Sequence, residues 1–203
     1  MNKVTTTMNN TIKTAKNIIR KEIDIKIKNI DKQELGRQSD VVYKKLIALP
    51  QYQLSKRISI YLSTDNEINT LSILKNIFDN NKEVFIPMYE GKLMKMVKLK
   101  SIQDYENLPI TKWNIKQPSV NDVRDDALLT GGLDLIILPG VAFTMSGKRL
   151  GHGMGYYDKY INNYIQLKNK KPYLIGLAFN EQIKDDIPTN EQDVNLDLIL
   201  TER

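Results

Sequence analysis

Residues 134–160 bring together the side chains best suited to chemistry, in the string DLIILPGVAFTMSGKRLGHGMGYYDKY. An apolar run leads into a loop rich in glycine and basic residues, and a segment with helical periodicity follows from Gly155. Five of the ten glycines fall within residues 140–155. Glycine lets backbone N–H groups approach a ligand closely, and a helix N-terminus favours an anion. The segment therefore predicts a site for a nucleotide or another phosphate, to which Lys148 and Arg149 add positive charge.

The usual phosphate-binding motifs do not match this loop. A P-loop has four residues between its first glycine and the Gly-Lys pair, and then Ser or Thr. Here six residues separate Gly140 from Gly147, and Arg149 follows Lys148. Residues 151–155 read GxGxG, whereas dinucleotide-binding folds have GxGxxG. Glycine content alone is also compatible with an ordinary surface loop.

The full string FTMSGKRLGHGMGYYDKY resembles the signature of the 5-formyltetrahydrofolate cyclo-ligase family, also called methenyltetrahydrofolate synthetases. The core of that signature is arginine, leucine, glycines at alternate positions, two tyrosines and an aspartate, here residues 149–158. Five more segments resemble the family in the same order: AKNIIRKEI, YLSTDNEINT, TKWNIKQP, GGLDLIILPG and PTNEQDVNLD. The resemblance covers nearly all of the chain beyond about residue 13. Thr144 stands where the family usually has aspartate, a departure expected to weaken loop ordering or a substrate contact.

The resemblance implies an ATP- and Mg²⁺-dependent ligase that converts 5-formyltetrahydrofolate to 5,10-methenyltetrahydrofolate, with release of ADP and phosphate. The formyl oxygen on N5 attacks the γ-phosphorus of ATP, and N10 then attacks the phosphorylated formyl group as phosphate leaves. Phosphoryl transfer of this kind depends mainly on alignment and charge neutralisation. It needs no cysteine nucleophile, and the chain has no cysteine. The resemblance assigns no general base.

The resemblance also implies a role for individual residues. We expect Arg149 and Tyr157 to be catalytic, and Asp158 and Asp193 to bind Mg²⁺. ATP is expected to contact a basic pair near the start of the chain and the whole glycine loop: Lys16, Arg20, Arg149, Leu150, Gly151, His152, Gly153, Met154, Gly155, Tyr156 and Tyr157. The folate is expected to contact Leu62, Glu67, Trp113, His152 and Tyr156.

Each of these residue types suits its role but also has an ordinary structural explanation. Lys16 and Arg20 share a helical face, and an arginine fork binds two phosphate oxygens, yet such a pair is also typical of a solvated basic stripe. Mg²⁺ takes one or two carboxylates, but an acid at Asp158 is favoured by the helix dipole without any function. Glu67 can accept hydrogen bonds from a pterin or be a surface acid. Trp113, the only tryptophan, can equally be a packing residue.

Length and composition are consistent with one domain. The 203 residues are 41% hydrophobic, enough for a single core. No apolar run is long enough to span a bilayer. A chain without cysteine has no disulfide or Cys-ligated zinc, and one histidine leaves little material for a His-based triad. We predict a disordered tail over residues 1–10 and a single domain over residues 11–203.

The positive charge is concentrated near the start of the chain. The net charge is +6, and residues 1–60 hold 13 Lys or Arg against 5 Asp or Glu, so the remainder is net −2. This distribution suits an anionic small ligand, nucleic acid, or a solvated lysine-rich face. Aromatic residues for base stacking are not interleaved with the basic ones, so we predict folate and ATP as partners, no nucleic acid, no membrane, and a monomer. We expect a cytoplasmic location; the acid-poor start keeps a mitochondrial leader as the alternative.

Alternating strands and helices predict the architecture. Asp31 is a candidate N-cap with Glu34 in the capping-box position. Apolar spacing predicts helices over residues 12–29, 31–48, 68–78 and 155–167, and strands over 57–62, 83–87, 93–99, 134–138, 173–179 and 196–200. We therefore predict an α/β protein, specifically a three-layer α/β/α fold with a mostly parallel central sheet. The segments 62–67, 140–155 and 178–181 each follow a strand, so they are expected at the same edge of that sheet.

Two other classes of function stay open. A different enzyme on the same phosphate-binding fold would act on a sugar phosphate or a CoA ester, without ATP. A non-enzymatic nucleotide- or RNA-binding module would bind polyanions in a salt-dependent way and show no turnover.

Overall fold

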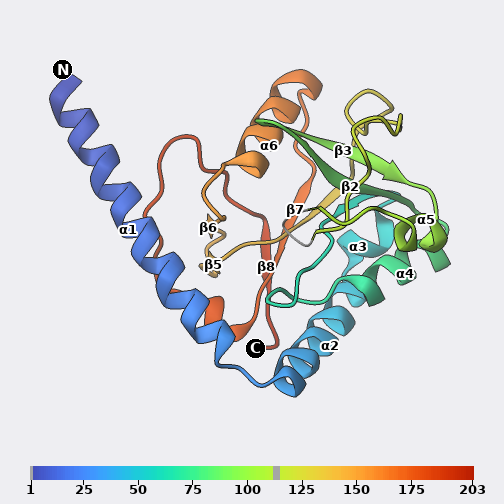
Figure 1. The fold of residues 1–203 in the computed structure, drawn as a ribbon, viewed down its shortest axis with the longest axis horizontal. Helices are drawn as coiled ribbons and strands as arrows, with labels where there is room; N and C mark the ends of the chain where they lie inside the picture. The colour runs from blue at the N-terminus through green and yellow to red at the C-terminus, as the bar shows by residue number, and fades with distance from the viewer. Residues whose placement is uncertain (1, 112–114) are drawn as a thin grey trace.

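A six-stranded sheet forms the centre of the molecule (Figure 1). The computed structural model describes residues 2–111 and 115–203, and side chains from residue 11 onward. The strands are β1 (Arg57–Ile60), β2 (Glu83–Glu90), β3 (Leu93–Leu99), β4 (Leu135–Leu138), β7 (Tyr173–Leu177) and β8 (Leu198–Leu200). Their order is β3-β2-β1-β4-β7-β8. β3 pairs antiparallel with β2, while the other neighbours pair in parallel, which confirms the predicted mostly parallel sheet.

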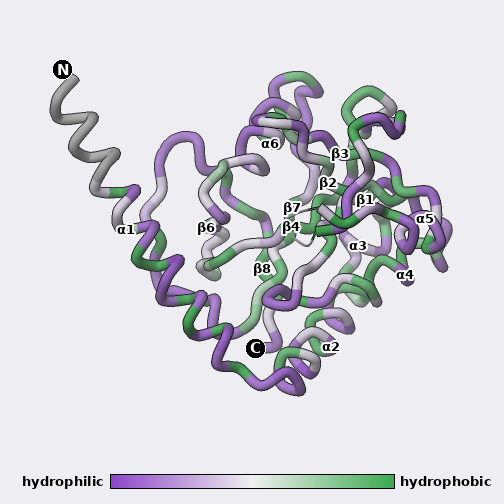
Figure 2. Tube along the Cα trace, in the orientation of Figure 1, coloured by the Kyte–Doolittle hydropathy of each residue, from purple (hydrophilic) through white to green (hydrophobic). Residues whose placement is uncertain are grey.

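The continuous apolar run of β4 arises because both faces of the sheet are covered. Leu135 and Ile137 belong to one core cluster, while Ile136 and Leu138 belong to the other. All four side chains are fully buried, as expected for a parallel strand between two layers. In Figure 2 the strands form an apolar centre, and the surface helices carry more polar residues.

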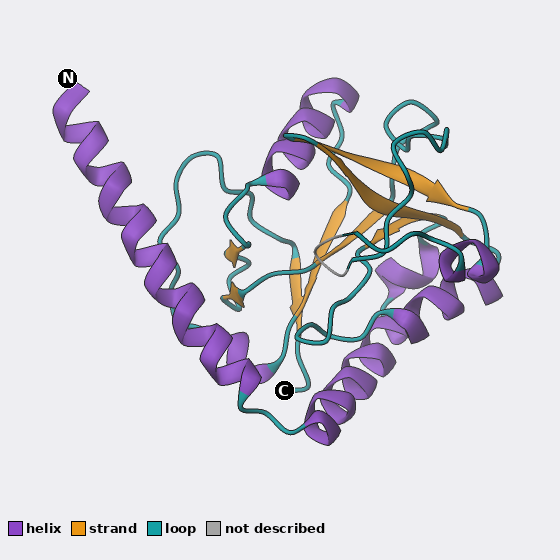
Figure 3. Ribbon diagram, viewed as in Figure 1, coloured by secondary structure: helices purple, strands orange, loops and turns teal. Residues whose placement is uncertain are grey.

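Helices cover both faces of the sheet, which confirms the three-layer α/β/α prediction (Figure 3). They are α1 (Asn2–Lys28), α2 (Lys32–Ala48), α3 (Pro50–Leu54), α4 (Leu71–Asp79), α5 (Ile102–Glu106) and α6 (Tyr156–Lys168). The cluster on one face contains side chains of α1 to α4. The other contains Tyr157, Tyr160, Ile161 and Tyr164 of α6.

Two helix ends show how local sequence and wider context combine. Asp31 caps α2 as predicted, since its carboxylate accepts the Gln33 N–H at 2.7 Å. Glu34 instead accepts hydrogen bonds from Arg37 and Gln38. The first helix begins at Asn2, ten residues before the predicted start at residue 12. The division of the chain into a tail and one domain stays a prediction.

The glycine loop contains a short hairpin that the sequence does not predict. Its strands are β5 (Ala142–Phe143) and β6 (Arg149–Leu150), and they pair antiparallel. The buried Thr144 hydroxyl accepts the Lys148 N–H at 3.0 Å, so a hydroxyl closes the turn where the family usually has a carboxylate. Gly147 has a φ of +92°, and a Cβ there would overlap the Leu196 carbonyl oxygen. Glycine is therefore required at this turn by both its backbone angle and its neighbour.

A buried ion pair orders part of residues 100–132. The guanidinium of Arg124 is only 4% exposed and binds Asp104 of α5 through two hydrogen bonds of 2.6 and 2.7 Å. Asp122 lies 2.7 Å from the same guanidinium. Trp113, an expected folate contact, lies outside the described residues.

Candidate active site

An open cleft of about 1230 Å³ lies between α1, the glycine loop, the start of α6 and residues 190–193. Figure 1 shows α1 along one side of the molecule, with β5, β6 and the segment leading to β8 beside it. Among the residues expected to bind nucleotide or metal, the cleft is lined by Lys16, Arg20, Arg149, Leu150, Gly151, His152, Gly153, Met154, Gly155, Asp158 and Asp193. The structure thus brings the basic pair of α1 together with a loop more than a hundred residues later in the chain.

Two ion pairs cross this cleft. The Lys16 ammonium lies 2.6 Å from a carboxylate oxygen of Asp193, and these side chains are 12% and 18% exposed. The Arg149 guanidinium lies 2.9 Å from the Asp158 carboxylate, and these side chains are 4% and 17% exposed. Each of the two carboxylates expected to bind metal is therefore paired with a cation expected to bind phosphate.

Arg149 is buried but not fully satisfied. Its Nη2 donates to Asp158, and its Nη1 donates to the Pro139 carbonyl oxygen at 3.2 Å. Its Cζ lies 5.4 Å from the centre of the Tyr157 ring. Within the described residues, the buried Nε has no hydrogen-bond partner. Buried donors in native structures nearly always have partners, so this guanidinium, which belongs to a residue of the cleft lining, is incompletely satisfied.

Arg20 holds the glycine loop against α1. Its Nε donates to the Gly151 carbonyl oxygen at 2.9 Å, and its Nη1 donates to Asn17 at 2.8 Å. Partial burial lowers the pKa of the Arg20 guanidinium, and the charge of Asp193 opposes that shift. At Gly153 the φ is +112°, and a Cβ would lie 3.6 Å from the Arg20 Cζ, so the loop backbone rests on this side chain.

The first turn of α6 faces the cleft. Its N-cap is Gly155 with a φ of +66°, which provides no side-chain hydrogen bond to the N–H groups of that turn. Uncapped N–H groups and the helix dipole favour an anion there. Asp158 lies in this first turn, and its other carboxylate oxygen accepts the Val194 N–H at 3.1 Å. An anion and a cation can therefore both be held at the same helix end.

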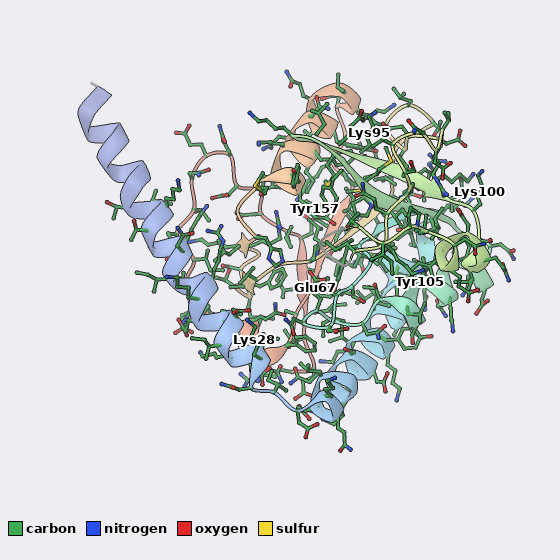
Figure 4. All side chains as sticks on the ribbon, in the orientation of Figure 1. Lys28, Glu67, Lys95, Lys100, Tyr105 and Tyr157 are labelled. Carbon is green, nitrogen blue, oxygen red and sulfur yellow. The ribbon has the colours of Figure 1, made fainter. Side chains whose placement is uncertain are left out.

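Glu67 forms a second centre, at the carboxyl end of β1. Its carboxylate accepts the Thr64 N–H and hydroxyl at 2.9 and 3.0 Å, and is 14% exposed. His152 Nε2 of the glycine loop lies 3.8 Å from the other Glu67 oxygen. Figure 4 labels Glu67 and Tyr157, and both lie toward the middle of the molecule. Burial raises the pKa of Tyr157 well above its ordinary value, and the charges of Tyr89 and Glu67 add to the shift.

Tyr89 is a neighbour of the site that the sequence does not reveal. Its ring centre lies 4.9 Å from that of Tyr156, whose hydroxyl donates to the Gly91 carbonyl oxygen at 2.8 Å. Burial raises the pKa of Tyr89 to about 12. The predicted strand ends at Pro87, whereas β2 continues to Glu90 and carries Tyr89 to the same edge of the sheet. Only the three-dimensional pairing of β2 with β3 extends the strand that far.

Several of the other residues expected to contact ATP or folate lie in the core or outside the cleft. Leu150 borders the cleft, but its side chain is fully buried in the core, so only its backbone is positioned for a ligand. Leu62 is partly buried against the same core cluster. Leu62, Glu67, Tyr156 and Tyr157 are not among the residues that line the cleft. The individual roles of all these residues stay predictions.

The charged groups fit Mg²⁺ by donor type. Searched over the described residues alone, the chain has no cluster of three or more His, Cys, Asp or Glu side chains suited to a metal. Mg²⁺ needs only one or two protein carboxylates when phosphate oxygens and water complete its shell. Asp158 and Asp193 border one cleft and meet that requirement.

The fold and site together define an α/β protein with a cleft lined by basic side chains beside the loop that follows β4. The model of the 5-formyltetrahydrofolate cyclo-ligase family matches residues 12–202. The chain is 46% identical to the 5-formyltetrahydrofolate cyclo-ligase of Mus musculus over 194 residues, which cover 95% of this chain and 96% of that protein. The NMR structure of Aquifex aeolicus 5,10-methenyltetrahydrofolate synthetase superposes with a TM-score of 0.74 at 29% identity, over 93% of this chain and 90% of that one.

The chain therefore belongs to the 5-formyltetrahydrofolate cyclo-ligase family, and it is an enzyme of that family. A relative from Arabidopsis thaliana, 31% identical over 92% of this chain and 73% of that protein, is named as mitochondrial. The cytoplasmic location of this chain stays a prediction. In the part of the chain that the structure describes, no helix combines the length and apolar character that crossing a membrane requires.

Proposed function

We propose that this chain converts 5-formyltetrahydrofolate to 5,10-methenyltetrahydrofolate at the expense of ATP, with Mg²⁺ bound beside the triphosphate. Family membership supports the overall conversion. The observation that carries the use of ATP is Arg149, which lines a cleft shared with Lys16 and Arg20. Three cations and a helix N-terminus suit a triphosphate better than a single phosphate.

The triphosphate would lie at the charged end of the cleft. Lys16 and Arg20 reach it from α1, and Arg149 reaches it from the glycine loop. Asp158 and Asp193 would hold Mg²⁺ there, and the ion would neutralise charge on the phosphate oxygens. Arg149 would stabilise the negative charge that develops during phosphoryl transfer, because a donor already held in place in a water-poor site does not have to reorient in the transition state.

The nucleoside would extend along the outer face of α6. Beyond Asp158 the cleft is lined by Asn162, Asn163 and Gln166 of that helix. Gln166 lies eight residues after Asp158, or about 12 Å along the helix at 1.5 Å per residue. Amide side chains carry both donors and acceptors, which suits the edge of a nucleobase and the ribose hydroxyls.

The pterin would lie between Glu67 and the glycine loop. The Thr64 hydrogen bonds fix the Glu67 carboxylate, which can accept from the pterin amino group and N3. Leu62 and Tyr157 would provide apolar surface, and His152 and Tyr156 would lie beside them. Trp113 is proposed as a further contact on the ground of the family resemblance alone.

The chemistry then needs positioning rather than a protein nucleophile. The formyl oxygen attacks the γ-phosphorus, and the bond to the ADP oxygen breaks as the new P–O bond forms. N10 attacks the formyl carbon and loses its proton, the C–O bond breaks, and phosphate leaves. Arg149 and the first turn of α6 would hold the transferred phosphoryl group, while Glu67 would hold the pterin in line with it.

The test is absorbance in the methenyltetrahydrofolate band after mixing the protein with 5-formyltetrahydrofolate, Mg²⁺ and ATP. We expect the band to grow only when ATP is present and to stop growing when EDTA removes Mg²⁺. A flat trace from folded protein that binds ATP would contradict the proposal and send the search to sugar phosphates and CoA esters. Salt-dependent binding of polyanions without any turnover would instead indicate a binding module.

A further inference from the structure

Two of the cations that line the cleft are paired with its two aspartates. Lys16 pairs with Asp193 and Arg149 pairs with Asp158, and all four side chains are less than a fifth exposed. These are the cations proposed for phosphate and the carboxylates proposed for Mg²⁺. The cations expected to bind phosphate are therefore already paired with the carboxylates expected to bind Mg²⁺.

We propose that ATP and the divalent cation bind this cleft cooperatively, through an exchange of ion-pair partners, and that each alone binds weakly. This inference rests on the proposed use of ATP and Mg²⁺. When both ligands arrive, Lys16 passes from Asp193 to a phosphate oxygen, and Asp193 passes from Lys16 to the metal. No charge is left without a partner in the loaded site.

A single ligand leaves one charge unpaired. A cation that takes the Asp193 carboxylate displaces the Lys16 ammonium into a site where it is only 12% exposed. A metal-free triphosphate that takes Lys16 leaves the Asp193 carboxylate facing more negative charge. An unpaired charge in a partly buried site is unfavourable, and the second ligand removes that penalty. Coupling between two sites is reciprocal, so each ligand tightens the other by the same factor.

Lys16 can change partner without release of α1 from the site. Arg20, one helical turn further along α1, stays bound to the Gly151 carbonyl oxygen at 2.9 Å. Deeper along the helix, Glu22 accepts two hydrogen bonds from Lys184 at 3.0 and 3.1 Å. Asp193 keeps a second contact within its own loop, because its carboxylate accepts the Asn190 N–H at 2.7 Å. Both ends of the exchange are therefore held in place independently of the ion pair.

The test measures binding rather than activity, with Mn²⁺ as a paramagnetic stand-in for Mg²⁺. Free Mn²⁺ is followed by electron paramagnetic resonance, and ATP binding is followed by calorimetry, with EDTA present for the metal-free arm. The proteins are the wild type, Lys16→Gln, Asp193→Asn, and Lys13→Gln as the matched control. Lys13 lines the same cleft from the same helix, so its variant removes equal charge without touching the pair. Circular dichroism checks that each variant is folded.

After correction for the Mn²⁺–ATP complex that forms in solution, we expect ATP to tighten Mn²⁺ binding to the wild type at least tenfold, and Mn²⁺ to tighten ATP binding by the same factor. Lys16→Gln should bind Mn²⁺ alone about tenfold more tightly than the wild type, because Asp193 is no longer paired. Asp193→Asn should bind metal-free ATP about tenfold more tightly, because Lys16 is free. Lys13→Gln should leave the affinity for Mn²⁺ alone unchanged.

Two results would overturn the inference in different ways. If Lys16→Gln and the wild type bind Mn²⁺ alone equally well, or if Asp193→Asn and the wild type bind metal-free ATP equally well, partner exchange is wrong while the use of ATP stands. If the wild type binds no ATP at millimolar concentration with or without Mn²⁺, the proposed function is wrong and the exchange falls with it.

Discussion

Replacing Arg149 by lysine separates the proposed phosphate contact from ordinary structural support. The side chain makes one charged hydrogen bond to Asp158 and one neutral bond to the Pro139 carbonyl oxygen. A lysine keeps the charge but has no planar fork to reach both acceptors and the cleft at once. We therefore expect Arg149→Lys to fold, to lose a modest part of its stability, and to lose most of its activity.

The magnitudes follow from those contacts. The charged hydrogen bond is worth about 1.5–3 kcal/mol and the neutral one about 1 kcal/mol, and lysine keeps one of them. The free energy of unfolding should fall by about 1–2 kcal/mol, which lowers Tm by roughly 2–8 °C for a chain of this size. Loss of a preorganised donor to the transition state should lower kcat/KM for ATP by about 10²–10³. Arg149→Met is less informative, because leaving the Asp158 carboxylate unpaired would lower the free energy of unfolding by about 3–5 kcal/mol and could abolish activity through unfolding alone.

The assay pairs thermal unfolding with the rate of ATP-dependent methenyltetrahydrofolate formation. Arg37→Lys is the control, because Arg37 also forms a bidentate pair, with Glu34, but on the exposed surface of α2. That change should leave both the stability and kcat/KM close to the wild-type values, because exposed ion pairs contribute little. If Arg149→Lys unfolds at a lower temperature yet keeps kcat/KM within threefold of the wild type, Arg149 is a structural residue and the phosphate assignment is wrong.

Two further predictions concern folate binding and acid stability. Glu67→Gln keeps the shape of the side chain but removes the charge that accepts from the pterin, so KM for the folate should rise about 10- to 100-fold while KM for ATP changes less; equal rises in both constants would contradict the assignment. Hydrogen bonds from Arg124 lower the pKa of Asp104 in the folded state below its ordinary value of 3.8. The pair therefore stabilises the fold fully at pH values above 3.8, and this contribution is lost as the pH falls through the pKa of the folded state. Asp104→Asn should lower the free energy of unfolding by about 2 kcal/mol at pH 7, because Asp122 still pairs with Arg124. Urea unfolding of the variant should depend less on pH below about pH 4, and an unchanged acid transition would refute that role.

The regular elements are predictable because their causes are local. β4 is apolar at every position, and the side chain of Asp31 itself caps α2, so the strand and the helix start could both be inferred directly from the sequence. The β5–β6 hairpin could not, because strands of two residues have no readable period. Its turn depends on the contact between Gly147 and Leu196, which only the folded chain creates. Pro50 lies just beyond α2 and begins α3, because proline fits the first position of a helix.

The residue types of the site could be predicted, but their pairing could not. Lys16 and Asp193 are 177 positions apart, and their ion pair depends on how α1 lies against the loop before β8. The sequence presents the cations and the two acids as separate ligand contacts, whereas the structure pairs Lys16 with Asp193 and Arg149 with Asp158. Tyr89 was missed for a similar reason, because the end of β2 is set by its partner strand and not by its own composition.

The protonation state of Tyr157 narrows what this expected catalytic residue can do. Its hydroxyl is buried, which together with the charges of Tyr89 and Glu67 raises its pKa well above the ordinary value of 10.0. The phenol is therefore protonated near neutral pH, where it can donate a hydrogen bond but is not suited to remove a proton from N10. A donor beside the Arg149 guanidinium suits an oxygen that gains negative charge, namely a transferring phosphoryl group or the leaving phosphate. The N10 proton therefore leaves by a route other than this phenol, and the role left to Tyr157 is the charge neutralisation on which phosphoryl transfer depends.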